Sequence, residues 1–357
     1  MSTAPRTFHV AFTGDFQAAD GTPKYPDIGL DVLAMHPHIT QNRFHEHHPV
    51  LGADQLAEAQ GVVVLTPRVT AASVAQSGDL LAIGRFGVGY DAVDVEACTE
   101  ADVLVFIAAG AVDHSVAEAT VGWMIALTHH VRAKDRLVRE CRWDERSNSM
   151  GRELRDRTFG AIGLGGIARK TIAMLESFGM NPPLAFDPYV APDAAGGARL
   201  TTLDGLLKTA DFVSIHCPLT DQTRNLIGRR ELALMKPDAY LINTARGGIV
   251  DEAALYESLR DGRIAGAAID CFAEEPVVRP HPLAELENVL LAPHSIAWTH
   301  ELFRDIGRAV CQGMVELSRG KRPRGVVNPQ VFERRGFQEK WSRLRVVDSG
   351  AEKANPT

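Results

Sequence analysis

The chain has 357 residues. At ~150 residues per domain, this length predicts about two domains, each large enough to bury a hydrophobic core. Hydrophobic residues (45%) and charged residues (23%) have ordinary globular shares, which excludes disordered, collagen-like and coiled-coil chains. The formal net charge of -7 argues against a nucleic-acid or anionic-membrane partner, because phosphate binding uses a concentrated basic surface.

The cysteines are scattered and form no C-x-x-C pair, so they predict neither a disulfide framework nor a zinc ribbon. They are Cys98, Cys141, Cys217, Cys271 and Cys311. The N-terminus lacks the features of a signal peptide, and the longest apolar run, 103–112, is shorter than the ~20 residues that span a bilayer. We therefore expect a soluble protein in the cytoplasm.

The first hundred residues predict a small α/β unit, because short apolar runs alternate with helical stretches. Strands bounded by Gly, Pro and Asp are expected at 9–12, 61–65, 79–84 and 102–107. Short helices are expected at 54–59 and 70–76.

A long amphipathic segment at 115–139 comes next and predicts one continuous helix. Ser115 and Glu118 have the spacing of a capping box, in which each side chain accepts an orphan backbone N–H. We interpret this segment as a packed or dimer-facing helix.

Regular strand–helix alternation follows, with strands predicted at 159–164, 183–187, 211–216, 239–244, 266–270 and 288–292. Six short apolar strands joined by crossovers indicate a parallel, doubly wound sheet. A last helix is expected at 299–317. The charged tail from Pro329 onward is expected to be partly loose, with Trp341 as its one large anchor.

The first strand of this sheet runs into the turn Gly163-Leu164-Gly165-Gly166-Ile167-Ala168, which reads G-x-G-x-x-A. Gly163 allows the tight turn, Gly165 lets the backbone approach a pyrophosphate, and Ala168 permits close helix–strand packing. The helix that follows would offer N–H groups and the positive end of its dipole. We predict that Gly163, Gly165, Gly166 and Ile167 hold the phosphates of a dinucleotide.

Asp187 ends the second strand at the ~20-residue offset of an acid that hydrogen-bonds the adenosine ribose. A carboxylate there would repel a ribose phosphate, and residues 188–190 offer no Arg to hold one. The sequence therefore favours NAD over NADP.

Ligands of an open α/β sheet bind outside the carboxyl ends of its strands. The residues there include candidate cofactor contacts, namely His216, Cys217, Pro218, Thr244, Ala245 and Asp270. An arginine, a carboxylate and a histidine also fall at these ends: Arg246, Glu275 and His294. Such a set suits reduction of a 2-oxo acid, which needs a cation for the substrate oxygens and a proton donor that titrates near neutral pH. A carboxylate beside the histidine would orient the ring and stabilise the imidazolium.

The stretches HCPLTDQTRNLI, LMKPDAYLINTARGGIVDEAAL, GRIAGAAIDCFAEEP and NVLLAPH resemble the D-isomer-specific 2-hydroxyacid dehydrogenase family, and the resemblance covers roughly 79–298. It implies that Arg246 binds substrate, that His294 is the general acid/base with Glu275 as its partner, and that Asp270 holds the nicotinamide carboxamide. The segment Arg85–Asp91 resembles the family's substrate-carboxylate loop, which implies substrate contacts from Arg85, Val88 and Gly89.

The resemblance also implies an α/β fold in which a Rossmann-type doubly wound parallel sheet is inserted in a smaller flavodoxin-like substrate domain. The expected boundaries are 1–108 with 299–330 for the substrate-binding domain, 109–298 for the NAD-binding domain and 331–357 for a C-terminal tail. A homodimer and a small 2-oxo or 2-hydroxy acid substrate are further implications.

The sequence departs from the family's pattern at three places. Residues 107–111 lack the Asn and Pro that many members carry, and Trp298 stands where many have small glycines. In the stretch 64–68, only Arg68 replaces the Arg/Ser-rich turn of phosphoglycerate dehydrogenases, which argues against 3-phosphoglycerate as substrate.

Two other functions fit the same motifs. One is a non-catalytic NAD(H)-sensing binding protein, which the complete Arg/Glu/His set disfavours. The other is oxidation of formate or phosphite, although formate dehydrogenases usually have Gln where Glu275 stands. A histidine cluster at 36–48 has no H-E-x-x-H spacing, so we interpret it as a polar loop and predict no metal.

Overall fold

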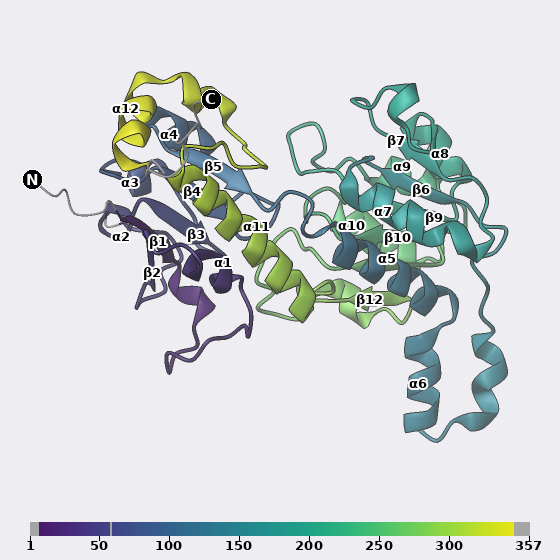
Figure 1. Ribbon diagram of the computed structural model, residues 1–357. Coiled ribbons are helices and arrows are strands. Elements are labelled where there is room, and N and C mark those ends of the chain that lie inside the picture. Colours follow the sequence, from purple (N-terminus) through teal and green to yellow (C-terminus); the bar gives the residue numbers. More distant parts are fainter. Residues whose placement is uncertain (1–6, 58, 346–357) are drawn as a thin grey trace, which may run out of the picture. The chain divides into compact units, whose positions relative to one another are not determined.

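The computed structural model describes residues 7–57 and 59–345, and the chain divides into two compact units (Figure 1). The first unit runs up to Val112 and resumes at Thr299, and the second is Asp113–Trp298. The second unit is therefore inserted in the sequence of the first. Each unit has one all-parallel sheet. The predicted fold class is therefore confirmed.

The sheet of the first unit has the strand order β2-β1-β3-β4-β5, which is the flavodoxin-like order. Its strands are β1 (Phe8–Phe12), β2 (Ile39–Arg43), β3 (Gly61–Val64), β4 (Ala82–Arg85) and β5 (Leu104–Ile107). Strand β2 was not predicted, because it is a polar edge strand whose middle residues are exposed. Its pairing with β1, from Phe8 opposite Ile39, gives it a strand conformation without an apolar run.

Short helices connect these strands: α1 (Leu30–Ala34), α2 (Ala53–Ala57), α3 (Ala71–Val74), α4 (Val95–Glu100) and the 3-10 turn η1 (Gly14–Phe16). Helix α11 (His300–Ser318), which follows the second unit, completes the first. It packs closely on the sheet, because a Cβ on Gly61 would lie 2.6 Å from the Met314 sulfur and one on Gly84 2.6 Å from Val310. Strand glycines thus make room for this late-arriving helix.

The chain continues in order through η6 (Pro329–Glu333) and α12 (Arg335–Leu344). Phe337 is fully buried, Trp341 Nε1 donates to the Leu317 carbonyl at 2.8 Å, and Lys340 Nζ donates to the Leu80 carbonyl at 2.8 Å. The expectation of a partly loose tail is therefore wrong over 329–345, because Phe337 supplies a second aromatic anchor that the sequence analysis did not weigh. The rest of that tail lies outside the described residues.

We predict that Phe337→Ala lowers the free energy of unfolding of the first unit by about 3–5 kcal/mol, the usual cost of emptying a buried phenylalanine site. The control is Arg335→Ala in the same helix, whose side chain is 91% exposed and whose loss is expected to change stability little. Urea denaturation of the full chain measures both. Equal stabilities of the two variants would contradict a structural role for α12.

The sheet of the second unit has the order β12-β11-β10-β9-β6-β7-β8, a Rossmann order with one strand added. Its strands are β6 (Phe159–Ile162), β7 (Leu184–Phe186), β8 (Arg199–Leu200), β9 (Phe212–Ile215), β10 (Tyr240–Asn243), β11 (Gly266–Ile269) and β12 (Val289–Leu291). All six predicted strands are present. The two-residue edge strand β8 was missed because it is too short to show a pattern.

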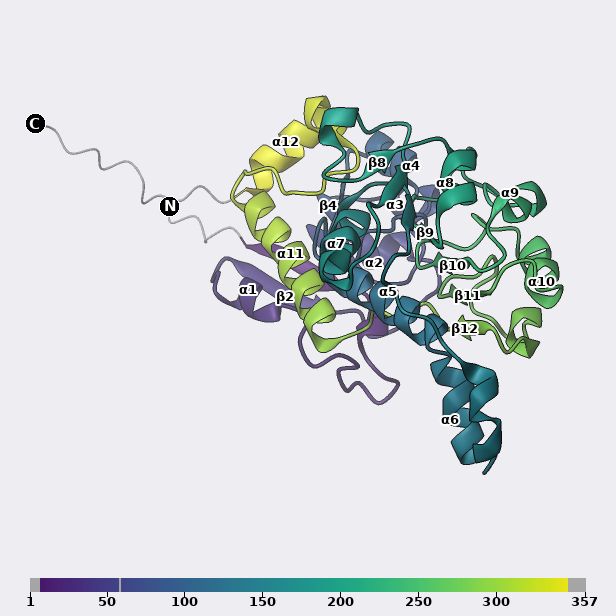
Figure 2. The ribbon, with the colours of Figure 1, turned by 90° about the vertical axis from the view of Figure 1, so that its right-hand side faces the viewer.

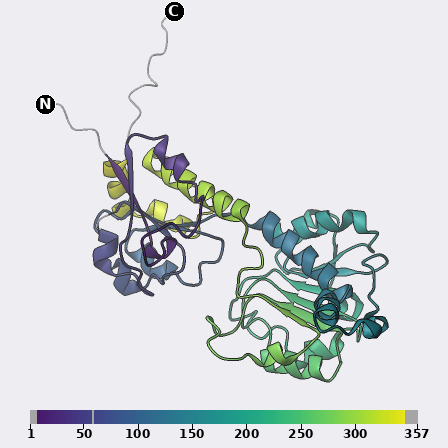
Figure 3. The same ribbon diagram turned by 90° about the horizontal axis from the view of Figure 1, so that it is seen from below.

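Helices cover both faces of this sheet (Figure 3). They are α5 (Asp113–Thr128), α6 (Val131–Arg139), α7 (Gly166–Leu175), α8 (Leu203–Thr209), α9 (Arg229–Leu234) and α10 (Glu252–Arg260), with short turns η2 (Trp143–Ser149), η3 (Glu176–Phe178), η4 (Pro192–Ala194) and η5 (Pro282–Glu285). Successive strand residues alternate between two cores: Val213 and Leu241 face one, and Phe212 and Ile242 the other. Burial on both faces explains the continuous apolar runs of the central strands.

The single helix predicted at 115–139 is two helices, because His130 adopts a left-handed conformation (φ 52°) between α5 and α6. Helix α5 begins at Asp113, so the buried Ser115 lies within its first turn and the predicted capping box is wrong. Helix α6 and η2 form an arm (131–150) that projects from the second unit (Figure 2). Among the described residues, no helix is both long and apolar enough to cross a bilayer.

Candidate active site

The glycine-rich turn after β6 has the geometry that its sequence predicts. Gly163 has φ +90°, and a Cβ there would lie 2.8 Å from the Cys217 backbone nitrogen, so only glycine fits. A Cβ on Gly165 would meet nothing within 4 Å, so a ligand can approach this backbone closely. Helix α7 begins at Gly166, and its buried Ala168 packs into the core. The backbone N–H groups at the start of α7 therefore point toward the glycine-rich loop that precedes the helix.

Asp187, directly after β7, lies beside this turn. Its Oδ2 accepts the Leu164 N–H at 2.8 Å and its Oδ1 accepts the Tyr189 N–H at 2.9 Å. The two hydrogen bonds fix the carboxylate at the end of the second strand next to the glycines. This is the arrangement that a ribose-binding acid requires.

Two polar atoms along the carboxyl ends of β9 and β10 have no partner within the described residues. His216 Nε2 and Thr244 Oγ1 are both buried without a hydrogen bond. Burial lowers the pKa of His216 to about 4, so its ring is neutral at physiological pH, and burial raises the pKa of the neighbouring Cys217 to about 11. Orphaned polar atoms beside a glycine cradle and a fixed carboxylate fit a dinucleotide, whose ribose and amide groups would satisfy them.

The low pKa of His216 predicts an acid-dependent loss of stability. The unfolded chain takes up this proton near pH 6.5 and the folded chain only near pH 4, so stability falls as the pH decreases through that window. Between pH 7 and pH 5 we expect His216→Gln to lose about 2 kcal/mol less unfolding free energy than the wild type. Urea denaturation without cofactor measures this.

The control for this prediction is His129→Gln, a change at an exposed histidine of the same unit. It should follow the wild-type dependence on pH. Parallel pH profiles for the wild type and His216→Gln would show that His216 titrates alike in both states.

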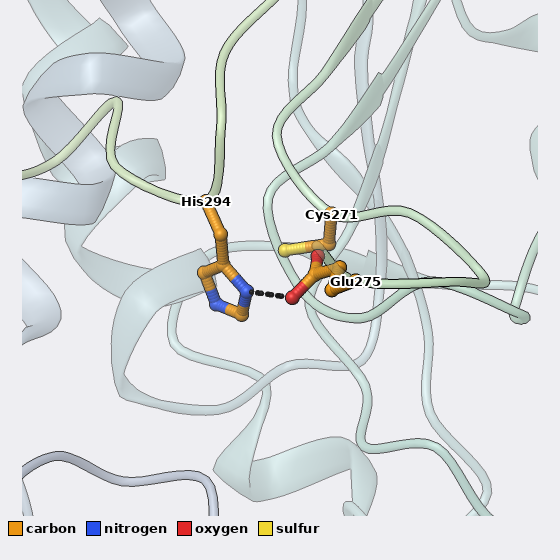
Figure 4. Close-up of side chains that lie close together, drawn as sticks. All are labelled: Cys271, Glu275 and His294. Carbon is orange, nitrogen blue, oxygen red and sulfur yellow. Dashed lines mark hydrogen bonds and ion pairs between the residues drawn. The ribbon is translucent and has the colours of Figure 1, made fainter. Parts of the chain in front are cut away.

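His294 and Glu275 form a direct pair (Figure 4). His294 follows β12 and Glu275 lies in the loop after β11, and His294 Nδ1 is 2.8 Å from Glu275 Oε2. The other carboxylate oxygen, Oε1, accepts the Phe272 N–H at 2.9 Å. Burial alone would raise the pKa of Glu275, but these hydrogen bonds and the positive charges of His294 and Arg246 outweigh it and hold the pKa below its ordinary value. Glu275 is therefore a carboxylate at neutral pH.

Asp270 fixes the loop that carries His294. This residue is 5% exposed, and its Oδ1 accepts the N–H groups of Ser295 at 2.8 Å and Ile296 at 3.1 Å. Its carbonyl accepts the His294 N–H at 2.8 Å. Burial raises the pKa of Asp270, although the two backbone hydrogen bonds oppose this. In this structure the carboxylate positions His294, a task that the sequence analysis did not assign to it.

Arg246 is held at the end of β10 by its own strand and by the β11 loop. Asn243 Nδ2 donates to the Arg246 carbonyl at 2.9 Å, and Arg246 Nη1 donates to the Ala245 carbonyl at 2.7 Å. A Cβ on Gly247 would overlap the Phe272 carbonyl, so the arginine turn presses against the loop that leads to Glu275. Asn243, a polar residue ending a buried strand, is a positioning residue that sequence reasoning missed; its polarity was the available signal.

The second unit thus brings Arg246, Glu275 and His294 to one edge of the sheet, together with the predicted cofactor residues. Arg85, Val88 and Gly89 belong to the first unit, in the loop after β4. Arg85 donates to the Phe86 carbonyl and, at 3.4 Å, to the Val64 carbonyl. Within that unit the arginine thus supports its own loop, and its predicted substrate contact stays a prediction.

In the first unit, the stretch 64–68 is held in place by hydrogen bonds to the buried side chain of Asp15. Asp15 is 5% exposed, and its Oδ2 accepts the Thr66 N–H at 2.8 Å, while Oδ1 accepts the Thr13 hydroxyl at 2.5 Å. Arg68 in this turn is exposed. The buried carboxylate, which the sequence analysis did not single out, ties the ends of β1 and β3 together.

Comparisons with known proteins agree with this geometry. A sequence model described as "D-isomer specific 2-hydroxyacid dehydrogenase, NAD binding domain" matches residues 121–295. The chain is 36% identical over 282 residues to a glyoxylate reductase of Thermofilum pendens, covering 77% of this chain and 83% of that protein. It is 39% identical over 296 residues to a D-3-phosphoglycerate dehydrogenase of Methanocaldococcus jannaschii, covering 82% of this chain and 55% of that protein. The chain belongs to the D-isomer specific 2-hydroxyacid dehydrogenase family.

The chain spans about half the length of the D-3-phosphoglycerate dehydrogenases that it matches (55% and 54%). Among solved structures, a D-lactate dehydrogenase of Aquifex aeolicus complexed with NAD and lactic acid is similar, with a TM-score of 0.75 and 26% identity, covering 87% of this chain and 96% of that one. The predicted cofactor, NAD, is confirmed by the family of the matched domain and by this neighbour. The prediction of an oxidoreductase agrees with the names of the relatives.

Proposed function

We propose that the chain is an NAD-dependent D-2-hydroxyacid dehydrogenase that interconverts a small 2-oxo acid and its 2-hydroxy acid. The observation that carries this proposal is the pair of His294 Nδ1 and Glu275 Oε2, 2.8 Å apart, at the sheet edge of an NAD-binding domain. Arg246 contributes positive charge at the same place, since it lowers the pKa of Glu275. A proton donor, its charged partner and a cation are what reduction of a 2-oxo acid requires.

The roles of the side chains follow from their chemistry. Arg246 holds the substrate's carboxylate and carbonyl oxygens with its planar fork. NADH, when bound, supplies the hydride that adds to the carbonyl carbon. His294 gives the proton on its Nε2 to the carbonyl oxygen, while its Nδ1–H donates to Glu275. Because Glu275 remains a carboxylate, it stabilises the imidazolium before the transfer and keeps the ring oriented afterwards. In the oxidation direction, neutral His294 takes the hydroxyl proton.

The expected substrates are small, unphosphorylated 2-oxo acids. A phosphorylated substrate carries a doubly charged phosphate in addition to its carboxylate. The turn at 64–68 offers Arg68 as its only cation to bind such a phosphate. Glyoxylate, hydroxypyruvate and pyruvate fit this restriction better than 3-phosphohydroxypyruvate. The relatives include both kinds, a glyoxylate reductase of Thermofilum pendens and a D-3-phosphoglycerate dehydrogenase of Methanocaldococcus jannaschii, so this expectation rests on the turn at 64–68.

The test is kcat/KM for glyoxylate, hydroxypyruvate, pyruvate, longer 2-oxo acids and 3-phosphohydroxypyruvate, each with NADH and NADPH. We expect a small oxo acid with NADH to give the highest value, because Asp187 would repel the ribose phosphate of NADPH. Tight NADH binding without turnover would favour the non-catalytic NAD(H)-sensing protein. Formate and phosphite with NAD belong in the same panel, although Glu275 in place of Gln disfavours them.

His294→Ala is expected to lower kcat with the best oxo acid by about 10²–10⁴-fold, the contribution of a general acid. Glu275→Gln keeps an acceptor but loses the charge, so kcat should fall less. The control is His129→Ala at an exposed site of the same unit. A His294→Ala rate near that of the control would refute the assignment.

We also propose that two copies of the chain associate through the arm (131–150). Four of its apolar side chains are open to solvent: Val131 is 51% exposed, Val138 60%, Trp143 61% and Met150 79%. Such a cluster on a projecting segment is typical of a protein contact.

All five cysteines, which lie within the described residues, are free, and this supports a reducing compartment such as the cytoplasm.

Trp143→Glu is expected to convert the dimer to a monomer, because a carboxylate would be buried without a partner in the contact. Analytical ultracentrifugation at micromolar concentration measures the change. Met35→Glu, a matched change at a 68% exposed apolar residue of the first unit, should leave the dimer intact. A wild-type chain that sediments as a monomer would contradict the proposal.

A further inference from the structure

The pair of His294 and Glu275 has a third neighbour that the proposed reaction does not use. Cys271 follows Asp270 at the end of β11, and its side chain lies beside the pair (Figure 4). One ligand atom from each residue, the Cys271 sulfur, a Glu275 oxygen and a His294 nitrogen, lie within 4.8 Å of one another. Cys271 is 1% exposed, and its thiol donates to the Ala245 carbonyl at 3.5 Å. The thiol is thus held in place next to the acid/base pair.

We propose that Cys271, Glu275 and His294 form an inhibitory binding site for Zn²⁺ and for softer divalent cations such as Cd²⁺. Sulfur, imidazole nitrogen and carboxylate oxygen are the three ligand types that Zn²⁺ uses in proteins. Zn²⁺ bonds of ~2.0–2.3 Å place tetrahedral ligands about 3.3–3.6 Å apart. To reach that geometry the pair at 2.8 Å would open by roughly half an ångström, and the sulfur would move from within 4.8 Å to within about 3.6 Å of the other two atoms. A fourth position is left for water or a substrate oxygen.

Binding of the metal would exclude catalysis. The cation takes the place of the proton between His294 Nδ1 and Glu275 Oε2, and the thiol proton of Cys271 leaves to solvent as the Zn–S bond forms. The imidazole is then a ligand, and the carboxylate that stabilises its protonated form is bound to metal. Reduction would stop until a chelator removes the ion. Mg²⁺ is not expected to bind, because a hard cation with oxygen preference gains nothing from a thiolate.

The proposal is tested by titrating the full chain with Cd²⁺, without substrate or nucleotide, and following the ultraviolet sulfur-to-metal charge-transfer absorption. This signal reports a thiolate ligand, so cations held by histidines elsewhere on the chain do not contribute. We expect one equivalent of Cd²⁺ to develop the band and EDTA to abolish it. Cys271→Ala should lack the band and bind Zn²⁺ at least about tenfold more weakly by calorimetry.

Cys141→Ser is the matched control, because Cys141 is an exposed free cysteine in the arm of the same unit. It should keep both the band and the wild-type affinity. Cys271→Ser, which preserves size, replaces Cys271→Ala if the alanine variant does not fold. A band that survives in the Cys271 variant, whatever the result for Cys141→Ser, or no band in the wild type, would overturn the proposal.

Kinetics give a second measurement, which rests on the proposed function. Cys271→Ala should keep basal turnover of the best oxo acid within about twofold and need at least about tenfold more Zn²⁺ for half-inhibition. Unchanged inhibition of this variant by Zn²⁺ would contradict the site. If the chain turns over no oxo acid, the absorption experiment still decides the metal site, so the two proposals fail separately.

Discussion

The buried carboxylate of Asp270 is the contact on which the geometry of the candidate site depends. It joins the end of β11 to the loop after β12, through hydrogen bonds from the N–H groups of Ser295 and Ile296. The Asp270 carbonyl holds the His294 N–H as well, and His294 adopts a left-handed conformation (φ 52°) that side chains seldom take. The three backbone N–H hydrogen bonds that Asp270 accepts offset that strain. Without them, neither the ring of His294 nor its distance from Glu275 would be fixed.

The pKa values of Glu275 and His216 at this sheet edge are both lowered, but for opposite physical reasons. Glu275 has hydrogen-bond donors and positive neighbours, so its pKa is low and its charge persists. His216 has neither, so burial keeps its ring neutral and leaves its Nε2 open to a ligand. One fold can support acid/base chemistry at neutral pH because neighbouring ionisable groups lie in different environments, which hold one charged and another neutral.

Much of the second unit follows from its sequence, because strands buried on both faces must be apolar and their carboxyl ends must share one edge. The same constraint predicts that Arg246, Glu275 and His294 share that edge, and the structure brings them together there. Sequence patterns do not predict elements whose conformation depends on strand pairing or tertiary contact. The edge strands β2 and β8 carry no apolar run, and the turn at His130 has no glycine or proline to mark it. Phe337 lies among charged residues of the tail, so its burial against the first unit does not show in a sequence pattern. Asp270 illustrates a further limit, since a strand-end acid does not reveal whether it will face a ligand or backbone N–H groups.

The net charge of -7 does not describe the electrostatics of the site. At physiological ionic strength a charge is felt over about 8 Å, so distant surface acids contribute little to the potential at the sheet edge. The Arg246 guanidinium lowers the pKa of Glu275, and the N-terminus of α7 lies beside the glycine turn. An acidic protein can therefore offer local positive potential to an anionic cofactor and an anionic substrate.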